Sequence, residues 1–250
     1  MDKETITIII LAIILLALIF FVIKNMGEPI SERIYLVNTY LYIYGGLLVI
    51  ILFCALMDKF NILQMLNPTL LLIIFITSMI SIVGLMLIPT ENQIFKHIFF
   101  VLFLFSISVI VLQWYKIALS NNSLYSVLLT LGLIIIALTV FAYTQPLDAF
   151  NSWGSYLMIG LCGLIIFQFF DILFGSTEGL LSRDRIYGWI TVILFSGFIL
   201  YDTQRIRKNA IMATELCVSK NQFECADYPT ESLALILDFI NLFAGVIRIS

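Results

Sequence analysis

Two aspartates stand alone inside long apolar stretches near the C-terminal end of the chain. Asp202 belongs to residues 195–204, FSGFILYDTQ, and Asp238 belongs to residues 235–243, LILDFINLF. A carboxylate is costly in a hydrocarbon environment, so an acid within an apolar segment indicates a functional site. Because the two acids lie on consecutive apolar segments, we interpret the rest of the chain as a bundle of helices that holds this pair.

Such a pair would bind protons and cations. Two carboxylates a few ångströms apart cannot both ionise at low cost, so they would share one proton and titrate together. Loss of that proton would drive the helices apart unless a cation entered. Ca²⁺ suits carboxylate oxygens but takes about six to eight ligands, so Asn241, backbone carbonyls and water would have to complete the shell around Asp202 and Asp238. This chemistry predicts a weak transit site for Ca²⁺ rather than a storage site.

The last apolar segment carries one narrow polar face. Steps of three and four residues along it meet Glu231, Ala234, Asp238, Asn241, Gly245 and Arg248. Residues at this spacing share one side of a helix, whereas nearly all other residues of the segment are large and apolar. Since lipid offers polar groups no partner, this face must contact protein or a water-filled cavity.

The acids differ in how strongly they indicate function. Asp238 has large apolar neighbours on both sides, which favours a functional or obligatorily paired acid. Asp202 lies at the end of its segment, where an interfacial acid paired with Arg205 one turn on is an equally good interpretation. Asp171 is a third acid within an apolar segment, and it either lines the same pathway or reaches water at the membrane surface.

The composition is that of a polytopic membrane protein. Of its 250 residues, 62% are hydrophobic and 12% are charged, compared with about 25% charged residues in soluble domains. The net charge of −3 gives no reason to expect a nucleic acid partner. The single histidine, His97, leaves too few ligands for a histidine-rich metal site. We also expect no tightly bound cofactor.

Eight apolar runs are long enough to span a bilayer, which takes about 17–25 residues. They fall at roughly residues 5–24, 35–57, 67–89, 95–118, 124–143, 153–175, 187–206 and 231–249. The longest polar gap, at about 207–230, leaves no room for a soluble domain. The sequence therefore predicts an all-α protein with eight transmembrane helices.

The first apolar run is almost purely aliphatic and has no polar face. It lacks the basic start and the small-residue cleavage site of a signal peptide. We therefore expect residues 1–30 to form a retained transmembrane anchor and residues 31–250 to form the main membrane domain. The basic cluster at 205–208 predicts a cytosolic position for the polar gap that follows it.

The four cysteines fall into two classes. Cys54 and Cys162 lie inside apolar runs, where cysteine usually contributes to packing. Cys217 and Cys225 share the gap at 207–230 and could pair in an oxidising compartment. Because the basic cluster places this gap in the cytosol, we expect two reduced thiols instead.

The two aspartate stretches resemble the signature of the transmembrane Bax-inhibitor-motif, or Bax inhibitor-like, family. The similar segments are residues 201–204, 227–228 and 237–243, with weaker likeness at 141–154 and 33–36. The resemblance runs from about residue 31 to the end. It implies a seven-helix bundle in which six helices wrap the last, polar-striped helix, and the segment at 5–24 would then be an additional transmembrane helix.

The resemblance also implies a function. Members of this family act as pH-sensitive calcium leaks that lower stored calcium and damp cell death, and their paired aspartates, here Asp202 and Asp238, sense protons and gate the pathway. They are multi-pass proteins of endomembranes (endoplasmic reticulum, Golgi or mitochondria) in eukaryotic or viral systems, and of the inner membrane in bacteria. The family's second helix often ends in a basic residue that contacts the pair. Residues 89–92 hold none, so either Arg205 replaces it or the gate works differently in this chain.

Three functions are compatible with the residues and with the resemblance. The first is a leak channel in a lipid bilayer, with Ca²⁺ as the permeant ion and protons as the signal. The second is a non-conducting regulator that binds other membrane proteins through its helices. The third, an intramembrane aspartyl protease, is disfavoured because its second aspartate normally follows Gly-x-Gly, and residues 235–237 hold no glycine. We therefore expect a protein that is not an enzyme.

Overall fold

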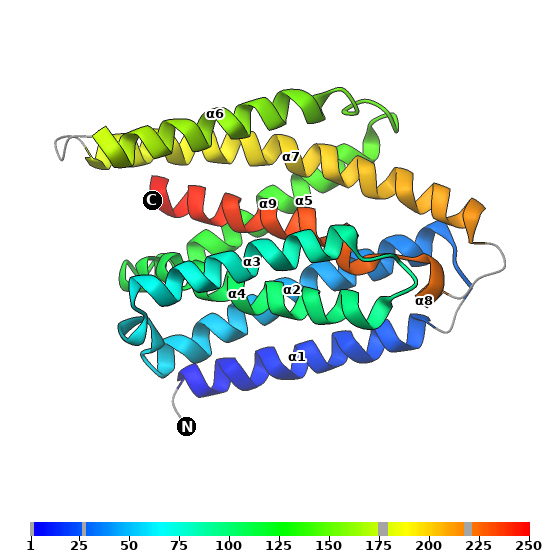
Figure 1. The fold of residues 1–250 in the computed structure, drawn as a ribbon, viewed down its shortest axis with the longest axis horizontal. Helices are drawn as coiled ribbons and strands as arrows, with labels where there is room; N and C mark the ends of the chain where they lie inside the picture. Colours follow the sequence, from blue (N-terminus) through cyan, green and yellow to red (C-terminus); the bar gives the residue numbers. More distant parts are fainter. Residues whose placement is uncertain (1–2, 27–28, 175–179, 218–221) are drawn as a thin grey trace. The chain divides into compact units, whose positions relative to one another are not determined.

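The chain forms a set of membrane-length helices. The computed structural model describes residues 3–26, 29–174, 180–217 and 222–250, and these residues form helices and no strand. In chain order (Figure 1) the elements are α1 (Lys3–Met26), α2 (Glu32–Lys59), the short 3-10 helix η1 (Ile62–Met65), α3 (Pro68–Leu87), α4 (Gln93–Ser120), α5 (Leu124–Thr144), α6 (Trp153–Phe174), α7 (Leu180–Leu216), α8 (Gln222–Cys225) and α9 (Tyr228–Ile249). Within these ranges, eight helices are long and apolar enough to cross a membrane. The predicted all-α class and number of spans are confirmed.

Helix α7 is longer than the apolar run from which it was predicted. Its 37 residues correspond to about 55 Å, compared with about 30 Å for the hydrocarbon core of a bilayer. No glycine or proline occurs between Gly197 and Pro229, so the helix continues past its apolar part. The gap predicted at 207–230 is therefore partly helical, because α7 ends at Leu216 and α8 follows before α9 begins.

Side-chain caps fix where two of the spans begin. At the start of α2, Ser31 Oγ accepts a hydrogen bond from the Ile34 amide (3.3 Å). Before α3, Asn67 Oδ1 accepts from the Leu70 amide (2.7 Å), and Pro68 occupies the first helical position. These caps satisfy amides that have no partner within the helix, and proline is tolerated where no such partner is needed.

The contacts between residues divide the chain into two compact units. Unit 1 comprises Met1–Lys116 and Asn209–Ile236, and unit 2 comprises Ile117–Lys208 and Leu237–Ser250. Helices α4, α7 and α9 contribute to both units, and the most apolar window of each of these spans is 50% buried. By contrast, the window of α1 has no buried residue. Because α4 and α7 are buried to the same extent as α9, burial does not single out α9, and the central position of the polar-striped helix stays a prediction.

Glycines let helices approach one another closely within each unit. In unit 1, a Cβ atom at Gly46 of α2 would lie 2.8 Å from Ile236 Cδ1 of α9. In unit 2, a Cβ atom at Gly188 of α7 would lie 2.9 Å from the carbonyl oxygen of Gly245 of α9. Because any larger side chain would clash at these places, small residues allow α9 to pack directly on its neighbours.

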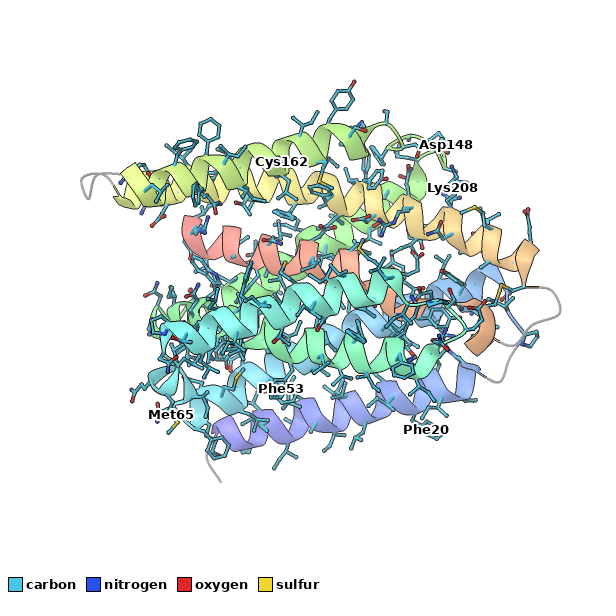
Figure 2. The ribbon with its side chains drawn as sticks, in the orientation of Figure 1. Phe20, Phe53, Met65, Asp148, Cys162 and Lys208 are labelled. Carbon is cyan, nitrogen blue, oxygen red and sulfur yellow. A yellow bond between two sulfur atoms is a disulfide. The ribbon has the colours of Figure 1, made fainter. Side chains whose placement is uncertain are left out.

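Helix α1 packs along α2 within unit 1. Near its end, Asn25 Nδ2 donates a hydrogen bond to Asn38 Oδ1 of α2 (3.2 Å). Most of its large apolar side chains are exposed, Phe20 among them (Figure 2), as expected for a helix that faces lipid. The proposed division into an anchor at 1–30 and a main domain at 31–250 stays a prediction.

The cysteines differ from the prediction in two respects. Cys217 and Cys225 form a disulfide, with a Cα–Cα distance of 6.0 Å, instead of two reduced thiols. That prediction rested on the charge of residues 205–208, whereas in the structure Cys217 directly follows α7 and Cys225 ends α8. Cys54 is buried as expected, but Cys162 is exposed, because only 6% of the apolar window of α6 is buried.

Candidate functional site

The structure brings the two aspartates of the sequence analysis together. Asp202 lies on α7 and Asp238 on α9, both within unit 2, and each has a relative exposure of 4%. Their carboxyl groups lie close enough to interact with each other. Because ionised carboxylates only accept hydrogen bonds, a hydrogen bond between them would require one shared proton. The structure therefore brings together the two acids that the sequence predicted to form a pair.

Arg205 supplies a positive charge beside this pair. Its Nη1 lies 3.1 Å from Asp202 Oδ1, one turn further along α7. The arginine side chain is 39% exposed and that of Asp202 is 6% exposed, so Arg205 extends from the buried acid toward the outside. With one shared proton, the two carboxyl groups and Arg205 are together neutral, which lowers the cost of burying them. The pairing of Asp202 with Arg205 and its contact with Asp238 thus exist together.

Three polar atoms at the pair are buried without a hydrogen-bond partner among the residues that the structure describes. They are Asp202 Oδ1, which has the charge contact with Arg205, Thr203 Oγ1 and Asp238 Oδ2. Buried polar atoms usually have partners, and the exceptions need an explanation such as a functional role. Asn241 is oriented by its own helix, because its Nδ2 donates to the Leu237 carbonyl (2.8 Å).

The arrangement does not form a resident metal site. In the described part of the chain, no group of three or more His, Cys, Asp or Glu side chains could hold a metal ion. Asp202, Asp238 and the Asn241 amide supply fewer oxygens than the roughly six to eight that Ca²⁺ takes. The residues present thus do not fit a stably bound Ca²⁺, and transit of the ion remains a prediction.

Asp171 is not brought to the pair. Its Oδ1 lies 2.6 Å from Arg183 Nη1, and the two side chains are 24% and 27% exposed. Arg183 lies near the start of α7, about 28 Å along that helix from Asp202 at 1.5 Å per residue. The structure therefore assigns Asp171 an ion pair with Arg183 rather than a place beside Asp238.

Gln204 of α7, next to the aspartate pair, forms hydrogen bonds with the loop between α5 and α6. Its Oε1 accepts from the Phe150 amide (3.0 Å), and its Nε2 donates to the Pro146 carbonyl (2.7 Å). Arg207 adds a bond from Nη1 to the Tyr143 carbonyl (3.3 Å). The sequence analysis assigned Gln204 no role, although its position two residues after Asp202 in an apolar context was a usable signal.

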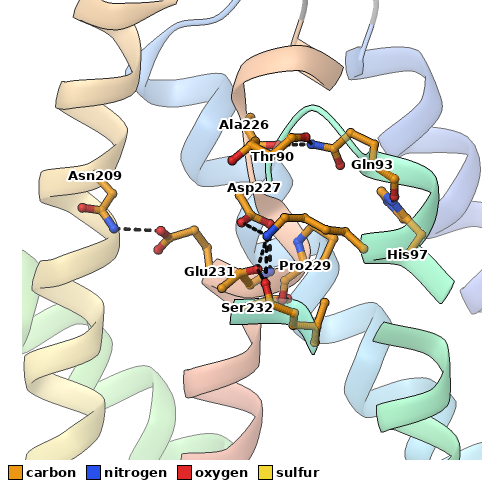
Figure 3. A network of polar contacts seen from close by, with 12 residues as sticks. Thr90, Gln93, His97, Asn209, Ala226, Asp227, Pro229, Glu231 and Ser232 are labelled. Atoms are coloured by element: carbon orange, nitrogen blue, oxygen red, sulfur yellow. Dashed lines mark hydrogen bonds and ion pairs between the residues drawn. The ribbon is translucent and has the colours of Figure 1, made fainter. Parts of the chain in front are cut away.

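A second buried charge lies in unit 1 and was missed in the sequence. Lys96, at the start of α4, is 2% exposed, and its Nζ donates to Asp227 Oδ2, the Leu85 carbonyl (2.8 Å) and Thr230 Oγ1 (3.0 Å). An ammonium group has three donors, so these contacts satisfy it. The network, seen from close by in Figure 3, joins the end of α3 and the start of α4 to the start of α9.

The sequence contained only a weak signal for this network. Lys96 is an isolated charge at the edge of an apolar run, a place that equally suits a loop residue. Its partner Asp227 is 131 residues away, so spacing alone gives no indication of the pair. In the same region Asn209 Nδ2 donates to Glu231 Oε1 (2.8 Å), which gives one member of the polar stripe a partner within unit 1 (Figure 3).

Comparisons with known proteins agree on one family. The sequence profile described as "Inhibitor of apoptosis-promoting Bax1" matches residues 32–250. Bax inhibitor 1 of Schizosaccharomyces pombe is 26% identical over 186 residues, 73% of this chain and 62% of that protein. An uncharacterized protein of Borreliella burgdorferi is 36% identical over 113 residues, 45% of each chain. Protein LIFEGUARD 2 of Arabidopsis thaliana is 28% identical over 128 residues, 50% of this chain and 46% of that protein.

The matches cover less than two thirds of the length of each of these relatives. The profile match, by contrast, begins after α1 and includes both Asp202 and Asp238. It covers most of the sequence, and within the described residues eight helices have the length and apolarity of membrane spans. The chain therefore belongs to the Bax inhibitor family and is an integral, multi-pass membrane protein.

Proposed function

We propose that this protein is a proton-gated leak pathway for Ca²⁺ and that Asp202 and Asp238 form its gate. The observation that carries the proposal is the contact of two buried carboxyl groups, on α7 and α9, beside Arg205. Membership of the Bax inhibitor family supports it, because both acids fall inside the matched residues 32–250.

The shared proton makes the contact sensitive to pH. While the proton is present, the two carboxyl groups attract each other and the helices stay together. When the proton leaves as the pH rises, the second carboxylate becomes charged and the two repel. At about 4 Å and an effective dielectric constant of about 20, two unit charges repel by about 4 kcal/mol. That energy corresponds to about a thousandfold change in the ratio of open to closed states, and Arg205 offsets part of it.

The charge of the opened pair selects cations. Two carboxylates and one arginine leave a net negative charge, so the pathway would attract Ca²⁺ and repel anions. Because the residues present supply too few oxygens to retain the ion, Ca²⁺ would pass through with water in its shell. A leak of this kind in an endomembrane would lower stored calcium, and through it damp cell death.

The test is Ca²⁺ entry into liposomes that contain the purified protein and an internal calcium dye, between pH 5 and pH 8. The wild type should leak faster as the pH rises. Asp238→Asn should lose most of that pH dependence, because an amide cannot take on the second charge. Asp171→Asn is the matched control, since it neutralises another acid of unit 2 and should keep the wild-type profile. A wild-type rate that stays constant over this range, or an unchanged profile in Asp238→Asn, would refute the gate.

A regulatory function is the second candidate, and the names of the relatives favour it. The family description and the name Bax inhibitor 1 attribute to those proteins the inhibition of another protein. In that case the exposed helix surfaces would bind other membrane proteins, and the aspartates would be a structural hydrogen-bonded pair. Liposomes that stay tight to Ca²⁺ at every pH would favour this function over the leak.

A further inference from the structure

A groove runs along the exposed side of α6 in unit 2. Its volume is about 780 Å³, and its wall on α6 combines the small residues Gly154, Ser155, Cys162 and Gly163 with apolar residues as far as Ile166. A Cβ atom at Gly163 would meet no described atom within 4 Å, so the small side chains leave this surface hollow. The groove spans roughly 20 Å of helix, comparable to the roughly 15 Å of hydrocarbon in one leaflet.

A small cavity of about 40 Å³ lies at one end of this groove. Asn151 and Tyr201 line both the groove and the cavity, so the two are continuous. Arg205 and Lys208 of α7 also line the cavity, and their side chains are 39% and 45% exposed. An apolar groove thus leads into a cavity that contains two cationic side chains.

Each of the two cations that line the cavity has one acid beside it. Lys208 Nζ lies 3.5 Å from Asp148 Oδ1, whose side chain is 72% exposed; Figure 2 shows the two together. Arg205 Nη1 lies 3.1 Å from Asp202 Oδ1. An ammonium group has three donors and a guanidinium group has five, so one acid neighbour does not use all the donors of either side chain.

We infer that the groove and the cavity together bind one anionic phospholipid, with an acyl chain along α6 and the phosphate between Arg205 and Lys208. A guanidinium group has five donors in one plane, so Arg205 can donate to a phosphate while one nitrogen faces Asp202. The contact between Lys208 and Asp148 is long and solvent-exposed, so it is weak and easily exchanged for a phosphate. Basic side chains near the end of a span are attracted by anionic lipid headgroups in the same way.

Lipid binding would connect the membrane to the acid pair through Arg205. A phosphate in the cavity would compete with Asp202 for the same guanidinium group, and so change the charge beside the gate. This consequence rests on the proposed function, whereas binding of the lipid does not.

Cys162 provides a direct probe of the groove. It is the exposed one of the two free cysteines, since Cys54 is buried and the other two form a disulfide. The rate at which an alkyl maleimide labels Cys162 can be measured in neutral detergent micelles. Added phosphatidylglycerol should slow labelling several-fold, whereas phosphatidylcholine with the same chains should not. Inorganic phosphate should also have no effect, because it lacks the chain that fills the groove.

Two matched pairs of variants test the two halves of the site. Lys208→Gln should lose the protection by phosphatidylglycerol, and Lys116→Gln should keep it, because Lys116 is an ion-paired lysine of unit 1. Gly163→Leu should fill the groove and reduce the phosphatidylglycerol that copurifies, as counted by native mass spectrometry. Gly132→Leu is its control on α5, since a Cβ atom there also meets no described atom within 4 Å.

The inference is overturned by equal protection from the two lipids, or by equal protection in Lys208→Gln and Lys116→Gln. Protection by inorganic phosphate alone would overturn it as well, because the cavity would then bind a soluble anion. None of these measurements involves Ca²⁺ flux, so a failure here is separate from a failure of the proposed leak.

Discussion

Asp227→Asn should destabilise the protein more than Lys96→Met, although both break the same buried ion pair. Lys96 is 2% exposed and Asp227 is 20% exposed. When Lys96 is replaced, the carboxylate of Asp227 can turn toward water. When Asp227 is replaced, the ammonium group stays buried without an opposite charge. Loss of one partner of a buried ion pair costs about 3–5 kcal/mol, and we expect Asp227→Asn to reach this range.

The remaining contacts refine this magnitude. Asp227 Oδ1 also accepts from the Thr230 amide at the start of α9 (3.3 Å). Asparagine has one oxygen, so it can keep this cap or face Lys96, but not both. Lys96→Met removes hydrogen bonds to a carboxylate that is partly hydrated, so we expect it to lower the free energy of unfolding by about 1–3 kcal/mol. The double variant should lose less than the sum of the two single variants, since no unpaired charge then stays buried.

The assay is equilibrium unfolding in mixed micelles with a rising fraction of a denaturing detergent, followed by tryptophan fluorescence. Lys116→Met is the matched control, because Lys116 pairs with Asp58 at 3.0 Å while both side chains are about a quarter exposed, 27% and 21%. An exposed pair of this kind contributes about 0–1 kcal/mol. Equal losses in Asp227→Asn and Lys116→Met, or additive losses in the double variant, would refute the account of Lys96 as a buried charge that needs its partner.

Three further predictions concern single contacts. Opening the disulfide by Cys217→Ser should cost about 2.5 kcal/mol by chain entropy for its short loop; the same unfolding assay should show this loss, and adding a dithiol reductant should lower wild-type stability to the level of the variant. Gly188→Leu should reduce the yield of folded protein on a size-exclusion column, because its Cβ atom would lie 2.9 Å from the carbonyl oxygen of Gly245, whereas Gly163→Leu should not. Gln204→Leu should leave a buried amide unpaired, at a cost of about 1–3 kcal/mol, and hydrogen exchange should become faster at residues 145–152 while other helices keep their rates.

The number and approximate position of the spans could be predicted from the sequence because lipid imposes a simple rule. A span needs an apolar stretch of minimum length, and the eight runs satisfied it. The same rule says nothing about how far a helix continues in water. For this reason the span at 187–206 was placed correctly, but the extension of α7 to Leu216 was not predicted.

The contacts between distant residues were harder to predict. Asp202 and Asp238 stood out because each is a lone acid in an apolar run, and their meeting followed from the expected packing of consecutive helices. Lys96 and Asp227 meet across 131 residues, and each lies at the edge of a run where a charge is unremarkable. Burial of the lysine depends on the turn between α3 and α4, which the hydropathy pattern does not specify.

The cysteine prediction failed because it used charge as a substitute for geometry. The basic cluster at 205–208 indicated a cytosolic loop and hence reduced thiols. In the structure, Arg205 faces Asp202, while Arg207 donates to loop carbonyls, so part of this cluster serves local contacts. The bond between Cys217 and Cys225 contradicts the reduced thiols that charge alone predicted, while the cytosolic position of this gap stays a prediction.

One turn of α7 connects the acid pair with its surroundings. Successive residues of a helix point about 100° apart, so neighbours in sequence face different partners, while residues three or four apart share a side. Tyr201 packs over Gly154 at the groove, Asp202 meets Asp238, and Gln204 holds the loop between α5 and α6. Arg205 follows Tyr201 by four residues and Asp202 by three, so it lies on the same side of α7 as both of them. A rotation of this turn by even a fraction of its period would therefore change the groove, the loop and the acid pair together, so a ligand that acts on either of the first two would also act on the acid pair.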